Sequence, residues 1–180
     1  MHYPTISTPR LKIRAFTQAD LPAFARYRAL PEVARFQSWS QYSLADAQAL
    51  FVAMNSVPFG TLDAWFQLAL ADTADQLIGD LALHFIDEQQ LEIGFTLAPE
   101  FQGQGLATEA LNALLAYLFE ECGKHRLIAI TDAENKAAWQ LLERLHFRRE
   151  GHFVENIFFK GHWGSEFQYA LLASEWRTLT

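Results

Sequence analysis

The chain has 180 residues, of which 51% are apolar and 14% aromatic, a composition typical of a folded globular protein. Its 21 acidic and 14 basic residues give a net charge of −7, which argues against a protein that binds along a nucleic-acid backbone. Because Cys122 is the one cysteine and no apolar run reaches the length of a membrane span, we expect a single cytoplasmic domain over residues 1–180, without a membrane segment.

The first third of the chain predicts one strand and two helices. Residues 10–16 alternate apolar and basic side chains, as an edge or half-exposed strand does. Thr17 and Ser43 each precede an aspartate by three positions, which is the pattern of a capping box. Helices are therefore expected directly after Thr17 and over residues 43–56.

Three strand-like runs follow, over residues 64–70, 76–86 and 90–98. The polar connections between them are short, so we expect antiparallel neighbours. A helix is then predicted from about Gln104 to Cys122, because leucine and alanine recur at every fourth residue and a glycine follows.

The last third predicts a strand over residues 126–132, whose mostly apolar residues suggest burial on both faces. A second amphipathic helix is expected over residues 135–146, and two or three strands around a turn at residues 160–164. The element order predicts a mixed α/β fold with a mostly antiparallel sheet of about seven strands. One parallel crossover runs through the helix that begins near Gln104.

The stretch PEFQGQGLATEAL, residues 99–111, places two glycines at the start of that helix. Free backbone N–H groups at a helix N-terminus form an anion site, and glycine lets a phosphate approach them. A Walker A loop is excluded because no Lys-Ser or Lys-Thr pair follows the glycines, and a Rossmann loop because the third glycine is missing. The pattern Q/R-x-x-G-x-G/A remains, and Gln102, Gly105 and Ala107 match it.

This pattern resembles motif A of the GNAT acyl-CoA N-acyltransferases, and the likeness extends along the chain. LEIGFTLAPEFQGQGLATEAL resembles the strand, loop and helix of that family, and AENKAAWQLLERLHF resembles the motif in which an asparagine begins a helix ending in Leu-Gly-Phe. TPRLKIRAFTQADLPAF and FQYALLASEW resemble the branch that acetylates the N-termini of ribosomal proteins.

The resemblance implies acetyl-CoA as the acetyl donor, a primary amine as the acceptor, and a splay between strands 90–98 and 126–132. It implies that the side chain of Gln102 and the loop N–H groups bind the pyrophosphate, and that the strand end and the next helix meet the pantetheine arm. The implied cofactor-binding residues are Leu97, Gln102, Gly103, Gln104, Gly105, Leu106, Ala107 and Asn135. Asn135 also has a purely structural interpretation as a helix N-cap.

A base is needed to remove the proton of the amine before it attacks. Glu92 is the first candidate, since it lies in the apolar sequence LEIGF and matches a glutamate common in the resembling branch; His84 is the second. The alternatives are an exposed strand residue or a structural ion pair for Glu92, and a core or surface histidine for His84. The family's usual thiolate-protonating positions hold Ala138 and Leu142 here, which cannot donate a proton.

Direct attack without a covalent enzyme intermediate is expected, because Cys122 lies at the far end of its helix from the loop. A metal site is not expected, because the six histidines lack ligand spacing. A protein or peptide N-terminus is the preferred acceptor. A small amine, a non-catalytic CoA-binding module, and a monomeric or homodimeric state all stay open.

Overall fold

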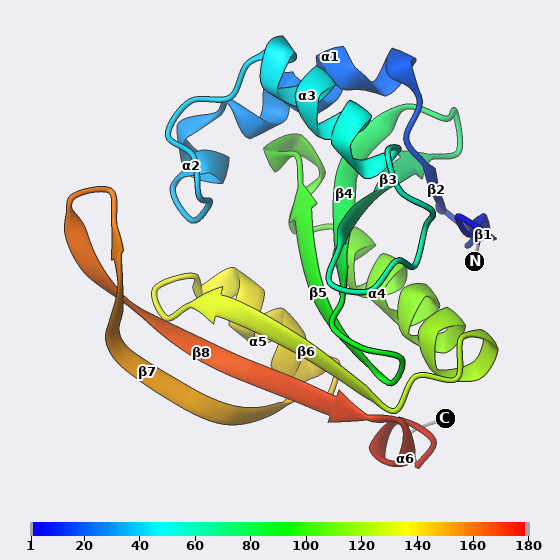
Figure 1. The fold of residues 1–180 in the computed structure, drawn as a ribbon, viewed down its shortest axis with the longest axis vertical. Helices are drawn as coiled ribbons and strands as arrows, with labels where there is room; N and C mark the ends of the chain where they lie inside the picture. Colours follow the sequence, from blue (N-terminus) through cyan, green and yellow to red (C-terminus); the bar gives the residue numbers. More distant parts are fainter. Residues whose placement is uncertain (1, 179–180) are drawn as a thin grey trace.

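The computed structural model describes residues 2–178. At its centre is an eight-stranded sheet with the strand order β1-β2-β3-β4-β5-β6-β8-β7 (Figure 1). Neighbouring strands are antiparallel except for β5 and β6, which are parallel. The strands are β1 (Ile6–Ser7), β2 (Leu11–Ala15), β3 (Trp65–Asp72), β4 (Leu77–Phe85), β5 (Gln90–Leu97), β6 (Arg126–Asp132), β7 (Arg148–Phe159) and β8 (His162–Leu172).

Six α-helices accompany the sheet in the described residues. They are α1 (Leu21–Arg28), α2 (Pro31–Ala34), α3 (Leu44–Met54), α4 (Leu106–Ala116), α5 (Lys136–Arg144) and α6 (Ala173–Trp176). Both predicted capping boxes are confirmed. At the start of α3, Ser43 Oγ accepts a hydrogen bond from the backbone N–H of Asp46 at 3.2 Å. Thr17 caps the turn Gln18–Asp20, which leads directly into α1.

The predicted mixed sheet with one parallel crossover is confirmed, and it has eight strands. Two local predictions need correction. Helix α4 begins at Leu106, two residues later than expected, because Gly105 has left-handed backbone torsions that an α-helix does not contain. Strand β6 is not buried on both faces: Leu127 and Ala129 face the core, whereas Ile130 on the other face is 42% exposed.

The sheet has a gap in its middle, beside β6. Strands β5 and β6 pair only over Gln90–Glu92, and beyond Glu92 the two strands diverge (Figure 1). The predicted splay is therefore present. It divides the sheet into a half formed by β1–β5 and a half formed by β6, β8 and β7.

The helices and the β7–β8 hairpin enclose this gap (Figure 1). Helix α1 contacts β4 and α3 contacts β3, while α5 lies beside β6. The hairpin extends to α2, where Lys160 Nζ donates a hydrogen bond to the carbonyl of Ala34. Within residues 2–178, no helix is long and apolar enough to cross a membrane.

Candidate active site

The glycine loop joins the end of β5 to the start of α4. Gly103 and Gly105 have φ angles of +73° and +77°, in the left-handed region that favours glycine. A Cβ atom on Gly103 would have no heavy atom within 4 Å. The loop surface is thus open for a ligand to approach the backbone.

The N–H of Gln102 donates to the carbonyl of Pro99 at 3.1 Å, but the N–H groups that follow it in the loop have no protein acceptor within residues 2–178. Within residues 2–178, the N–H groups of Gly103, Gln104 and Gly105 donate no hydrogen bond. Those of the first turn of α4, from Leu106 to Thr108, have no partner inside the helix. Consecutive free donors at a positive helix end fit a pyrophosphate well.

A cavity of about 570 Å³ opens in front of this loop, between β5 and α5. All but one of the predicted cofactor residues line it, namely Leu97, Gln102, Gly103, Gly105, Leu106, Ala107 and Asn135. Gln104 does not line it: its side-chain amide donates to the carbonyl of Glu100 at 3.0 Å. The fold therefore brings seven of the eight predicted cofactor-binding residues to one cavity.

Leu97 turns its backbone toward the gap. The N–H of Ala98 donates to the carbonyl of Ile78 on the β4 side, and backbone groups alternate along an antiparallel strand. The N–H of Leu97 therefore points away from β4, into the gap. Its carbonyl accepts from Gln102 Nε2 at 2.9 Å, so this amide ties the loop to the end of β5. Contact of Gln102 with phosphate, through its other N–H, stays a prediction.

Asn135 caps α5, as its structural interpretation requires. Its Oδ1 accepts a hydrogen bond from the backbone N–H of Ala138 at 3.2 Å. The same two residues line the first cavity and a second one. The N-cap role is confirmed, and it holds Asn135 at the point where the two cavities meet.

The second cavity has a volume of about 340 Å³ and lies on the other side of β5. Its lining shares six residues with that of the first cavity, namely Phe36, Gln37, Phe95, Thr96, Asn135 and Ala138. Two small residues, Ala82 on β4 and Gly94 on β5, form part of its lining, and they are cross-strand neighbours. Ligands in the two cavities would meet at the splay.

Glu92 lines the second cavity, and His84 stands beside it. The two residues are cross-strand partners, with His84 Nδ1 3.9 Å from Glu92 Oε2. His84 Nε2 lies 3.2 Å from Asp63 Oδ1, and Trp65 stacks on the imidazole with ring centroids 4.8 Å apart. Burial raises the pKa of Glu92 above its ordinary value. The arrangement is a half-buried carboxylate beside a histidine whose buried Nδ1 has no hydrogen-bond partner within residues 2–178.

A buried ion pair in this cavity was not predicted from the sequence. Arg28 Nη2 lies 2.9 Å from Asp80 Oδ2, and the guanidinium stacks on Phe24 and Trp39, with its Cζ atom 4.1 and 4.5 Å from their ring centroids. The one available signal was an aspartate inside the otherwise apolar run LIGDLALHF. Nearby, the buried Oε1 of Gln67 has no hydrogen-bond partner within residues 2–178.

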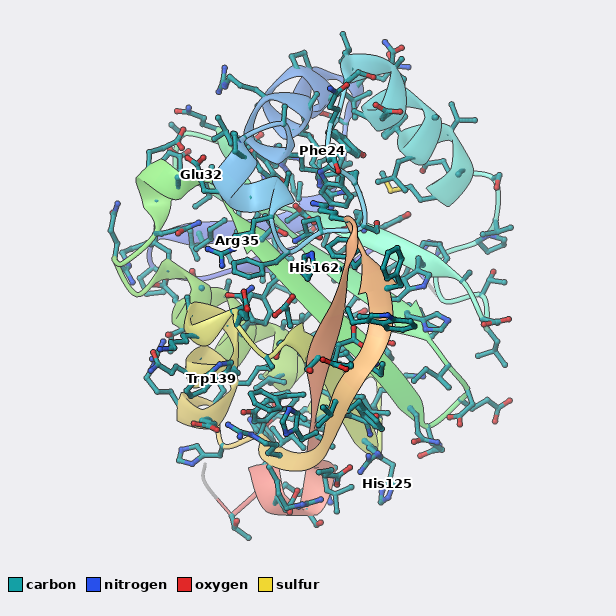
Figure 2. The ribbon with its side chains drawn as sticks, turned by 90° about the vertical axis from the view of Figure 1, so that its left-hand side faces the viewer. Phe24, Glu32, Arg35, His125, Trp139 and His162 are labelled. Atoms are coloured by element: carbon teal, nitrogen blue, oxygen red, sulfur yellow. The ribbon has the colours of Figure 1, made fainter. Side chains whose placement is uncertain are left out.

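The segment around α2 adds Glu32, Val33, Phe36 and Gln37 to the lining of the first cavity. Figure 2 shows Glu32 and Arg35 on the α2 segment, with His162 of the hairpin tip beside them and Trp139 on α5 below. Arg35 Nη2 pairs with Glu134 Oε2 at 3.1 Å, which links this segment to the start of α5.

Residues 10–148 match the acetyltransferase (GNAT) domain. The chain belongs to the GNAT acetyltransferase family. It is 34% identical over 172 residues to the uncharacterized N-acetyltransferase YnaD of Bacillus subtilis, covering 95% of this chain and 98% of that protein. It also resembles the crystal structure of a GNAT-family acetyltransferase from Bacillus anthracis, with a TM-score of 0.85, 28% identity, and coverage of 96% and 100%.

Two shorter matches reach relatives with a named acceptor. The [ribosomal protein uS5]-alanine N-acetyltransferase of Escherichia coli is 32% identical over 84 residues, or 47% of this chain and 43% of that protein. The spermidine N(1)-acetyltransferase of Vibrio cholerae is 30% identical over 112 residues, or 61% and 65%. This GNAT chain is an acetyl-CoA-dependent N-acetyltransferase.

Proposed function

We propose that this enzyme acetylates the N-terminal α-amine of a protein or peptide. The observation that carries the proposal is the charge of the second cavity. Asp80, its most deeply buried carboxylate, is already neutralised by Arg28 at 2.9 Å. Glu92 and Asp132 are the other carboxylates in the lining. A cavity with this balance suits an acceptor that carries one amine.

A polyamine is the competing acceptor. Spermidine carries three positive charges at neutral pH, whereas only two lining carboxylates, Glu92 and Asp132, remain to balance them once Arg28 and Asp80 neutralise each other. A peptide instead brings amide groups to the unpaired Oε1 of Gln67, which accepts a hydrogen bond from an N–H. The uS5-alanine acetyltransferase supports the peptide proposal, and the spermidine acetyltransferase supports its rival. The unpaired Oε1 of Gln67 and the small number of free carboxylates favour the peptide.

The glycine loop is the proposed pyrophosphate site. Its free N–H groups from Gly103 to Thr108 would hold the phosphates of acetyl-CoA, and the β5–β6 gap would hold the pantetheine arm. Bound there, acetyl-CoA supplies a thioester carbonyl next to the end of β5. The N–H of Leu97 then stabilises negative charge on the carbonyl oxygen, as an oxyanion donor does.

Glu92 is the proposed general base. It takes a proton from the ammonium of the acceptor, directly or through one water, while His84 positions its carboxylate. The neutral amine attacks the acetyl carbon, the C–S bond breaks, and the nitrogen gives its second proton to water as the amide forms. Because Ala138 and Leu142 have no acidic proton, the CoA thiolate takes its proton from water.

The test is a comparison of acceptors at saturating acetyl-CoA, with release of the CoA thiol as the readout. Peptides that begin with alanine or serine are compared with spermidine and with the same peptides blocked at the N-terminus. We expect kcat/KM to be at least about tenfold higher for the free peptides than for spermidine, a difference of about 1.4 kcal/mol. A preference for spermidine would overturn the peptide assignment and leave the acetyltransferase assignment intact.

The proposed setting is a single domain over residues 1–180 that acts in the cytoplasm. The continuous eight-stranded sheet spans almost the whole chain, from Ile6 to Leu172, which supports one folding unit. The relatives with named acceptors are bacterial, and bacterial ribosomal proteins are made in the cytoplasm.

A further inference from the structure

Arg10 lies against the back of the glycine loop, although it is far from it in sequence. Its Nη1 donates to the backbone carbonyl of Gln104 at 3.0 Å, and its Nε donates to Glu109 Oε2 at 2.6 Å. A Cβ atom placed on Gly105 would lie 3.6 Å from Arg10 Nη2. The guanidinium thus contacts the loop at the residue between the two glycines.

The hydrogen bond to Gln104 fixes the direction of one peptide plane. In a trans peptide, the carbonyl of Gln104 and the N–H of Gly105 point in opposite directions. Because that carbonyl points at Arg10, the N–H of Gly105 points away from it, on the side where Gly105 lines the first cavity. Arg10 itself does not line that cavity.

This peptide plane has unusual freedom without such a contact. Gly103 and Gly105 flank Gln104, and both have positive φ angles and no Cβ atom to restrict rotation. A rotated plane would present a carbonyl oxygen to an approaching phosphate in place of an N–H. Two negatively polarised groups would then repel each other.

Arg10 is itself held in place by a side chain of α4. Glu109, in the first turn of α4, accepts hydrogen bonds from Thr8 Oγ1 at 2.6 Å and from the backbone N–H of Arg10 at 3.0 Å. These two bonds and the one from Arg10 Nε engage both carboxylate oxygens. The hydrogen bond from Thr8 lowers the pKa of Glu109, so the carboxylate stays ionised near neutral pH.

We propose that Arg10, held by Glu109, is a positioning residue that orients the Gln104–Gly105 peptide so that the N–H of Gly105 binds the pyrophosphate of CoA. The inference rests on the proposed pyrophosphate site at the glycine loop. Arg10 lies outside the glycine-loop motif, so the proposal gives a residue near the N-terminus a part in cofactor binding.

The first test measures the Kd of CoA by isothermal titration for the native chain, Arg10→Met and Arg10→Lys. We expect Kd to rise about tenfold in Arg10→Met. Arg10→Lys should show most of the same rise in Kd, because a single ammonium group cannot replace a guanidinium that donates to Glu109 and Gln104 together. Lys12→Met is the matched control, since Lys12 lies two residues further on, in β2, has a similarly exposed side chain, and pairs with Asp75.

The second test separates orientation of the loop from general damage to the fold. Acetyl-pantetheine lacks the pyrophosphate, so its use as acetyl donor should be unchanged in Arg10→Met, while the KM for acetyl-CoA rises and kcat stays within about twofold. Equal losses with both donors, full rescue by lysine, or a native Kd in Arg10→Met would each overturn the proposal.

A loop variant distinguishes this failure from a failure of the site itself. If Gly105→Glu binds CoA normally, the pyrophosphate binds elsewhere, and both the proposed site and the proposed role of Arg10 are wrong. If Gly105→Glu loses binding and Arg10→Met does not, the site stands and the positioning role is wrong.

Discussion

Glu92 and His84 face each other across the β4–β5 pair, with Glu92 Oε2 3.9 Å from His84 Nδ1. Trp65, the next residue in the same cross-strand row, stacks on the imidazole. Glu92 lines the second cavity, and the stacked rings of His84 and Trp65 lie next to it in this row. This relationship makes separate predictions for the two side chains.

Glu92→Gln should lower kcat by about 10²–10⁴-fold, because the amide cannot accept the proton of the acceptor. The Kd of CoA should stay unchanged, since Glu92 does not line the first cavity. Steady-state kinetics with a peptide acceptor, together with titration of CoA, check both statements. Glu88→Gln, at an exposed glutamate, serves as the control. A fully active Glu92→Gln would eliminate this residue as the base.

The pH dependence of kcat/KM should contain an acid limb that belongs to Glu92. Burial raises its pKa above the ordinary value of 4.5, and a base works only when ionised, so activity is lost as pH falls through the raised pKa. The proximity of His84 lowers the pKa of Glu92, so His84→Gln should move the limb to higher pH. Exposed Glu88→Gln is the control, and its limb should stay in place; a limb that also stays in place in His84→Gln would contradict the coupling.

Gly105→Glu should abolish measurable binding of CoA, because it puts a carboxylate at the proposed pyrophosphate site. Gly123→Glu makes the matched control. Gly123 also has a positive φ of +63° and open space around its Cβ position, so it carries the same backbone strain, of about 1 kcal/mol, far from the loop. Titration of CoA into both folded variants tests the prediction, and comparable binding by the two would exclude the loop.

Gly94→Ala should raise the KM for the peptide acceptor about tenfold and leave the KM for acetyl-CoA unchanged. The added Cβ would lie 3.3 Å from the Cβ of Ala82 and narrow the second cavity. Ala82→Gly is the opposite change, and it should improve the use of peptides with a larger first residue. If Gly94→Ala affects acetyl-CoA instead of the acceptor, the assignment of the two cavities is reversed.

Glu150→Gln should reduce the free energy of unfolding by about 1 kcal/mol at neutral pH. Hydrogen bonds from Arg126 and Arg148 lower the pKa of Glu150 to about 2, so its ionised form stabilises the fold. That stability is present above the ordinary pKa of 4.5 and is lost as pH falls toward 2. Denaturant titrations at several pH values should show the native and variant chains converging on acidification, whereas exposed Glu121→Gln stays close to native throughout.

Features encoded by neighbouring residues could be predicted from the sequence. The capping box at Ser43, the antiparallel strands and the glycine loop each depend on a few consecutive positions. The pairs Arg10–Glu109 and Arg28–Asp80 could not be predicted, because only the folded sheet brings partners 99 and 52 residues apart into contact. The exposed face of β6 was missed for the same reason, since the gap beside it is a property of the whole sheet.

The short pairing of β5 with β6 has a consequence for how the protein behaves in its surroundings. Two panels of sheet meet along a seam of three residue pairs, Gln90–Arg126, Leu91–Leu127 and Glu92–Ile128. Acetyl-CoA bound beyond these three pairs, as proposed, would take the place of the missing backbone partner of β5 and contact both halves of the sheet. We therefore expect the free energy of unfolding to rise with the concentration of acetyl-CoA, so that the protein is most stable when its own substrate is abundant.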